Sequence, residues 1–304
     1  MGADLLVHDA RKGPASADDV TVAVCQLAPR VGEPERNVDR AVRAVRTAAD
    51  HGAQLIVLPE LVTSGYVFAD AAEARRLAER PDGPGLTRLA AVAREREVVL
   101  VAGFPELADD GTLHNSAALF DVDGLRAVYR KAHLWDREKE IFVPGDAPPP
   151  VVATALGRIG VVICYDLEFP EWMRLVALGG ADIVCAPTNW PAEPRPTGER
   201  PIEVVRAQAS ASVNRVFLAV ADRAGDERGV RWVSGSAIIG PDGYPLATAE
   251  ASAAERAGRE QILLAACRLA EARRKAVSPR NDVFDDRRPG LYRPLVVPEP
   301  PSPA

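Results

Sequence analysis

Short, mostly apolar segments recur along this chain, and a segment with helical spacing separates the first two. Residues 21–28 and 54–58 predict buried strands, and residues 34–51 between them predict an amphipathic helix closed by Gly52. A strand, a helix and a second strand in that order form a parallel, right-handed crossover. This unit places the chain in the α/β class.

The succession of strands and helices continues, and hairpins are added to it. Hairpins are predicted at 115–130 around Asp123-Gly124 and at 234–248 around Asp242-Gly243. Because helices cover one face of each sheet, the other face must be buried against a further layer. We therefore expect two sheets face to face with helices outside. A single doubly wound sheet is the alternative, and the absence of G-x-G-x-x-G after a strand disfavours it.

Composition excludes several classes of protein. The net charge of −6 argues against a nucleic-acid binder, and no apolar run approaches the roughly 20 residues of a membrane span. The first residues lack the pattern of a secretory signal, and the four cysteines are far apart without a C-x-x-C pair. We expect a cytoplasmic protein with no metal and no cofactor. Residues 1–19 are expected to form a flexible arm, and residues 293–304 a Pro-rich tail.

The segment GVVICYDLEFPEWMR places a thiol at the end of a buried strand. The strand ends at Cys164, and Pro170 looks like the start of a helix. Aligned backbone N–H groups and the positive end of a helix favour a thiolate at such a turn. The other interpretation is that Cys164 is one more buried cysteine, like Cys25, Cys185 and Cys267.

Three chemically complementary residues each follow a predicted strand. Glu60 follows QLIVLP, Lys131 follows LRAVYR, and Cys164 follows GRIGVVI. A base, a cation and a thiol suit nucleophilic attack on a carbon multiply bonded to oxygen or nitrogen. Cys164 would attack, Glu60 would carry the proton, and Lys131 would stabilise the developing negative charge with the backbone N–H of Tyr165.

These segments resemble the signature blocks of the nitrilase superfamily, the carbon–nitrogen hydrolases with a Glu-Lys-Cys triad. LIVLPELVTSGY resembles the glutamate block, YRKAHLWDREKEIFVPGD the lysine block and GVVICYDLEFPEWMR the cysteine block, in the family order. The resemblance covers residues 20–292 and implies a four-layer α-β-β-α sandwich. It also implies a homodimer or larger assembly through the helices near the cysteine. A second active-site glutamate is implied, for which Glu138 fits best and Glu140 is a near neighbour.

One departure from the family pattern lies in the helix expected at 203–214, where Val213 stands in place of a glutamate that supports an ion pair. The residues expected to bind substrate or line the entrance lie near the three strand ends. They are Tyr66, Tyr165, Glu168, Asn189 and Trp190, with Trp135 as a further candidate.

The resemblance implies an amidase that releases ammonia from a small amide through a Cys thioester. An N-carbamoyl hydrolase or a nitrilase with the same triad is the alternative, and Arg195 and Arg200 are candidates for a substrate carboxylate. A Cys–His hydrolase using His133 or His114, and a silent binding protein on the same fold, stay open as further alternatives.

Overall fold

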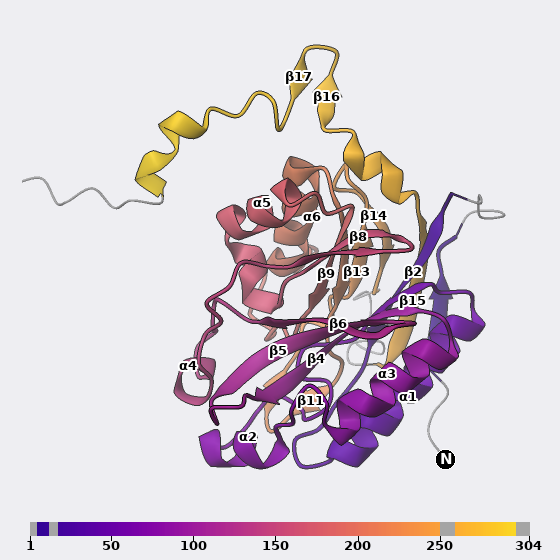
Figure 1. The fold of residues 1–304 in the computed structure, drawn as a ribbon, viewed down its shortest axis with the longest axis vertical. Helices are drawn as coiled ribbons and strands as arrows, with labels where there is room; N and C mark the ends of the chain where they lie inside the picture. Colours follow the sequence, from indigo (N-terminus) through magenta and orange to yellow (C-terminus); the bar gives the residue numbers. More distant parts are fainter. Residues whose placement is uncertain (1–4, 12–17, 250–258, 296–304) are drawn as a thin grey trace, which may run out of the picture.

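The computed structural model describes residues 5–11, 18–249 and 259–295. Two large sheets lie against each other in these ranges, and helices cover the outer face of each (Figure 1). This arrangement confirms the predicted α-β-β-α sandwich. No helix in the described ranges is long and apolar enough to cross a membrane.

The first sheet carries the predicted crossover unit at its centre. Its order is β1 (Leu6–Asp9), β15 (Gln261–Cys267), β2 (Val20–Gln26), β3 (Leu55–Val57), β4 (Val99–Leu107), β5 (Leu113–Asp121) and β6 (Gly124–Arg130). Strands β2, β3 and β4 run parallel, and β4, β5 and β6 form an antiparallel meander. Helices α1 (Pro34–Asp50) and α3 (Pro84–Glu95) cover its outer face.

Alternating side chains of this sheet enter two separate cores. On β2, Val22 and Val24 point into the core between the sheets, whereas Ala23 and Cys25 pack beneath α1 and α3. This alternation is the period of two expected of a strand. Both faces are apolar because both are buried, so the strand carries no polar face in its sequence.

The second sheet completes the core between the layers. Its order is β14 (Pro245–Thr248), β13 (Ala237–Ile239), β10 (Phe217–Ala221), β9 (Ile183–Pro187), β8 (Gly157–Val161) and β7 (Val151–Thr154). Helices α5 (Pro170–Leu178) and α6 (Ile202–Asn214) cover its outer face. Several apolar side chains on these helices are exposed, namely Leu175, Leu178, Ile202, Val205 and Val213. Pairing of two copies through these helices stays a prediction.

The departure at Val213 leaves a cation without a carboxylate. Arg174 on α5 donates from Nη2 to the carbonyl oxygen of Val213 at 2.8 Å. Its Nη1 is buried and has no hydrogen-bond partner among the residues that the structure describes. Burial lowers the pKa of Arg174, which is the expected effect on a cation withdrawn from water.

Two predictions at the chain ends are wrong. Leu6–Asp9, expected in a flexible arm, is an edge strand that pairs in parallel with β15. The spacing of apolar residues at 269–277 predicts a helix, but these residues form a 3₁₀ turn, η2 (Leu269–Arg273), followed by strand β16 (Ala276–Ser278), which pairs with β17 (Asn281–Asp282). The tail begins with a 3₁₀ turn, η4 (Arg293–Leu295), and its residues 296–304 lie outside the described ranges.

Shorter elements lie at the sheet edge where the predicted site residues emerge. They are α2 (Ala71–Leu77), α4 (Glu138–Ile141), the 3₁₀ turn η1 (Cys164–Glu168), and the hairpin β11 (Asp226–Glu227) and β12 (Val230–Arg231). The 3₁₀ turn η3 (Pro289–Leu291) belongs to the C-terminal segment after β17.

Candidate active site

The strand ends converge as predicted on one buried ionic cluster. Lys131, directly after β6, donates from Nζ to Glu60 Oε1 at 2.8 Å and to Glu138 Oε1 at 2.7 Å. The side chains of Lys131 and Glu60 are fully buried, and that of Glu138 is 3% exposed. Glu140 is an exposed neighbour of Arg137, so the structure brings Glu138 and not Glu140 against the lysine.

The backbone around Glu60 is tightly fixed. The Gly103 N–H donates to the carbonyl oxygen of Pro59 at 3.2 Å, and Leu61 has a φ of 49°, a left-handed conformation that is uncommon for leucine. A Cβ on Gly103 would lie 2.6 Å from the Glu60 Cα, so only glycine lets β4 approach so closely. The crowded backbone therefore directs Glu60 toward Lys131.

Two buried asparagines orient the Glu60 segment. Asn115 on β5 donates from Nδ2 to Glu60 Oε1 at 2.7 Å. Asn189, after β9, donates from Nδ2 to the backbone oxygen of Glu60 at 2.9 Å. These bonds leave Glu60 Oε2 buried and without a hydrogen-bond partner among the described residues. That oxygen is the one free to accept a proton.

Cys164 lies at the first residue of η1, after the end of β8. Its φ of 47° is left-handed, as in a sharp strand-to-helix turn. The thiol points toward the backbone oxygen of Asn189, with Sγ and O 3.9 Å apart. Asn189 therefore contacts both the thiol and the Glu60 segment. It was predicted to bind substrate, but it is not among the residues that line the cavity beside Glu138 described below.

The thiol is not the resting thiolate that the sequence predicts. Burial raises the pKa of Cys164, and the negative charge of Glu60 raises it further, while the Lys131 ammonium acts in the opposite direction. Burial likewise raises the pKa of Glu60 to about 7, against the effect of Lys131. The two carboxylates raise the pKa of Lys131 in spite of its burial. The arrangement suits a neutral thiol beside a carboxylate that can take its proton, with a permanent cation hydrogen-bonded to that carboxylate.

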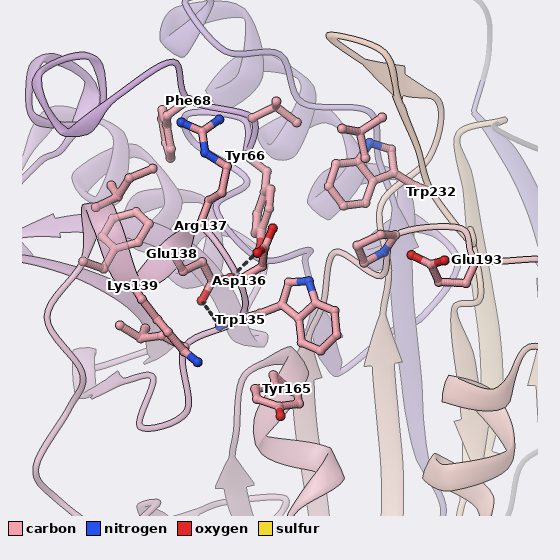
Figure 2. Close-up of a pocket in the computed structure, with 16 residues that line it drawn as sticks. Tyr66, Phe68, Trp135, Asp136, Arg137, Glu138, Lys139, Tyr165, Glu193 and Trp232 are labelled. Atoms are coloured by element: carbon pink, nitrogen blue, oxygen red, sulfur yellow. Dashed lines mark hydrogen bonds between the residues drawn. The ribbon is translucent and has the colours of Figure 1, made fainter.

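A cavity of about 540 Å³ opens beside Glu138 (Figure 2). Six of its lining side chains are aromatic: Tyr66, Phe68, Trp135, Phe142, Tyr165 and Trp232. The others are Val67, Leu134, Ile141, Pro191, Val230, Asp136, Arg137, Glu138, Lys139 and Glu193. The Tyr66 hydroxyl donates to Glu138 Oε1 at 2.5 Å, and the backbone N–H of Trp135 donates to Glu138 Oε2 at 3.1 Å. Glu138 thus connects the cavity to Lys131.

Two predicted entrance residues lie elsewhere. Glu168 accepts a hydrogen bond from Arg206 on α6 at 2.6 Å, because η1 ends beside that helix. Trp190 is 5% exposed and packs in the main core. The wall is formed instead by Trp232, which lies opposite Pro191 in an isolated bridge. The alternation Val230, Arg231, Trp232 before a predicted hairpin was the one sequence signal for it.

The remaining candidates have other partners. His133 Nδ1 lies 2.7 Å from Asp166 Oδ1, and His114 Nδ1 lies 2.7 Å from the carbonyl oxygen of Val143. Neither ring has a hydrogen bond to Cys164 in the described ranges. Arg195 and Arg200 line a different hollow, so neither faces the cavity beside Glu138.

The chain is similar to known enzymes over nearly its whole length. A model of the carbon-nitrogen hydrolase family matches residues 21–276. A nitrilase of Pyrococcus abyssi is 37% identical over 276 residues, which cover 90% of this chain and 99% of that protein. An N-carbamoylputrescine amidase of Solanum lycopersicum is 35% identical, with 91% and 95% covered.

A solved structure has the same fold. It is a variant of the amidase from Nesterenkonia sp. AN1 that shows covalent addition of the acetamide moiety of fluoroacetamide at the active site cysteine. It matches with a TM-score of 0.75 and 28% identity over 93% of this chain and 99% of that chain. Family model, relatives and structure agree on hydrolysis of carbon–nitrogen bonds. The chain belongs to the carbon–nitrogen hydrolases of the nitrilase superfamily.

Proposed function

We propose that this protein is a cofactor-independent amidase that hydrolyses a small amide through a thioester on Cys164. The observation that carries the proposal is the burial of one ammonium between two carboxylates beside a neutral thiol. The covalent acetamide adduct on the cysteine of the Nesterenkonia amidase supports the same role for Cys164.

The acylation step follows from the cluster geometry. Glu60 Oε2 takes the thiol proton while the sulfur of Cys164 attacks the amide carbon. The carbonyl oxygen becomes negative, and the Lys131 ammonium stabilises it, because a fully buried charge is poorly screened by solvent. The carbon–nitrogen bond then breaks, and Glu60 returns the proton to the leaving amine, so that ammonia departs and a thioester remains.

The deacylation step uses the same groups in reverse. Water attacks the thioester carbon, and Glu60 accepts the proton of that water. The carbon–sulfur bond breaks, the carboxylic acid is released, and the sulfur of Cys164 recovers a proton. Glu138 is hydrogen-bonded to Lys131 through Oε1, and its Oε2 accepts from the backbone N–H of Trp135. Because Glu138 is fixed in this way, it keeps Lys131 charged and in place during both steps.

An N-carbamoyl amine hydrolase is the second candidate, because the tomato relative is an N-carbamoylputrescine amidase. A nitrile hydrolase with the same triad is a third, after the Pyrococcus relative. Products separate the first two reactions: an amide gives only ammonia and an acid, and a carbamoyl group also gives carbon dioxide. A nitrile gives the same acid and ammonia as an amide, so activity on nitrile substrates identifies the third reaction.

The test is ammonia release from a panel of short amides, N-carbamoyl amines and nitriles, with carbon dioxide measured in parallel. Cys164→Ala, Glu60→Gln and Lys131→Met should each abolish turnover, while His133→Ala, which removes the ring contact with Asp166, should lower turnover without abolishing it. Intact mass should detect an acyl adduct on the wild type and none on Cys164→Ala. Turnover that survives Lys131→Met but not His133→Ala would overturn the proposal in favour of a Cys–His pair.

A further inference from the structure

A buried ion pair on the far side of the cavity has no part in the mechanism above. Arg223, after β10, is 1% exposed, and Glu227 on β11 is 5% exposed. Arg223 donates from Nη1 to Glu227 Oε2 at 2.8 Å and from Nη2 to the carbonyl oxygen of Pro29 at 2.6 Å. A buried pair of this kind is costly to desolvate and is weak evidence for stability alone, and its contacts extend outward to the wall of the cavity.

The Glu227 carboxylate joins the segments that contain Arg223, Val31 and Tyr66. Its Oε1 accepts from the backbone N–H of Val31 at 2.8 Å. Its Oε2 accepts from the N–H groups of Tyr66 at 2.9 Å and Val67 at 2.8 Å. The side chain of Tyr66 in turn reaches Glu138. The ion pair therefore fixes the backbone of a residue that touches the carboxylate beside Lys131.

The same pair holds one wall of the cavity. The guanidinium of Arg223 lies over the ring of Trp232, 4.6 Å from its centroid. The opposite neighbour is Tyr66, whose ring meets Trp232 edge to face at 5.3 Å and 80°. Figure 2 shows Trp232 beside Tyr66, with Trp135 below them and Tyr165 below Trp135. A tryptophan held between a cation and a second ring is preorganised for contact with a flat ligand.

The charged side chains of the cavity wall have both signs. Glu138 is already hydrogen-bonded to the buried Lys131 ammonium, which it shares with Glu60. Of the other charged lining residues, Asp136 and Glu193 are opposed by Arg137 and Lys139. What distinguishes the cavity is therefore its aromatic surface.

We propose that Trp232, held in place by the Arg223–Glu227 pair, selects amides whose acyl group carries a flat, uncharged substituent such as a phenyl ring. The inference rests on the proposed amidase function. Trp232 contacts the substituent, and Arg223 and Glu227 are positioning residues that act through Trp232 and Tyr66.

The test compares 3-phenylpropionamide with acetamide. The wild type should have a kcat/KM at least ~10-fold higher for the phenyl amide, a size typical of one well-packed ring. Trp232→Ala should remove most of the preference for the phenyl amide by raising KM for that substrate, and Trp232→Phe should retain part of the preference. Glu227→Gln, which weakens the support of Trp232 and Tyr66, should lower the preference. Tyr244→Ala, on an exposed residue, is the matched control and should leave the ratio unchanged.

Binding separates this inference from the proposed function. Calorimetric titration of Cys164→Ala with both amides measures the preference without turnover, and Trp232→Ala on that background should remove it. If Cys164→Ala prefers acetamide, or if Trp232→Ala leaves the preference intact, the inference is overturned. If wild type binds the phenyl amide in this way but hydrolyses no amide, the proposed function fails while the binding preference stands.

Discussion

Asp166 accepts a hydrogen bond from the Tyr129 hydroxyl at 2.7 Å, and this bond joins the turn of Cys164 to the strand of Lys131. Asp166 is fully buried and accepts from three further groups: the Ile163 N–H at 3.0 Å, the His133 N–H at 3.1 Å and His133 Nδ1 at 2.7 Å. Ile163 precedes Cys164, while Tyr129 and His133 flank Lys131 on either side. One carboxylate therefore sets the position of the thiol relative to the ammonium.

Asp166→Asn should impair the reaction more than it impairs folding. The asparagine side chain has one NH₂ group where aspartate has a second acceptor oxygen. This NH₂ group would face the donors that now bond to Asp166, so at least one of the four hydrogen bonds is lost and the turn that carries Cys164 shifts. A displacement of this kind costs about 100-fold in kcat. The measurements are kcat and the rate of Cys164 alkylation by iodoacetamide, read by peptide mass. Tyr129→Phe, which removes only one of the four bonds, should give a smaller loss; equal activity of both variants and wild type would contradict the role.

The pH dependence should report Glu60. Because its pKa is raised to about 7, the ionised base is present only above that pH, and kcat/KM should rise with pH through about 7. Asn115 hydrogen-bonds the ionised form, so Asn115→Ala should raise the pKa of Glu60 and move this limb to higher pH. The measurement is a kcat/KM profile from pH 5 to 9. An acid limb near pH 4.5 would show that Glu60 is not the group that titrates.

Stability gives an independent check on the same residue. A carboxyl whose pKa is higher in the folded state than in the unfolded chain stabilises the fold below its ordinary pKa. That contribution is lost as pH rises through about 7. The Tm of wild type should therefore fall relative to Glu60→Gln between pH 5 and pH 8. A difference that does not change with pH would mean that the folded-state pKa of Glu60 is ordinary.

Gly103→Ala should damage both fold and site. The added Cβ would lie 2.6 Å from Leu61 N and 2.7 Å from the Pro59 oxygen, which are backbone atoms that cannot rotate away. Overpacking of this kind costs about 1–3 kcal/mol in the free energy of unfolding and should displace Glu60. Denaturant unfolding and turnover measure the two effects. Gly290→Ala, where a Cβ would meet nothing within 4 Å, is the control and should match wild type.

The positions of Glu60, Lys131 and Cys164 could be predicted because each residue follows a segment that reads as a strand. Local pattern alone places Glu60 and Cys164 at the ends of the strands β3 and β8. These strands belong to different sheets, and the packing of one sheet on the other brings the two residues together. The protonation of the thiol could not be predicted. It depends on burial and on Glu60, which is distant along the chain, and these outweigh the local turn.

Elements that depend on distant contacts were missed. Leu6–Asp9 is short and half polar, and its partner β15 lies near the other end of the chain, so no local pattern marks it as a strand. Residues 269–277 have helical spacing, but Arg273 pairs with Asp182, and Lys275 donates to the backbone oxygens of Asn214 and Arg215. These contacts with the second sheet draw the chain into an extended form after η2. The burial of the Arg223–Glu227 pair could not be predicted either, because the sequence around these two charged residues does not distinguish them from exposed ones.

The place of β15 between β1 and β2 has a consequence for synthesis on the ribosome. Strand β2 pairs with β3, which leads to Glu60, and its other edge has no partner until residues 261–267 of β15 emerge from the exit tunnel. A nascent chain that stops short of them carries an unpaired, apolar edge, which invites association with other chains. A premature stop codon late in the message should therefore yield aggregates for proteolysis, and not a weakened hydrolase.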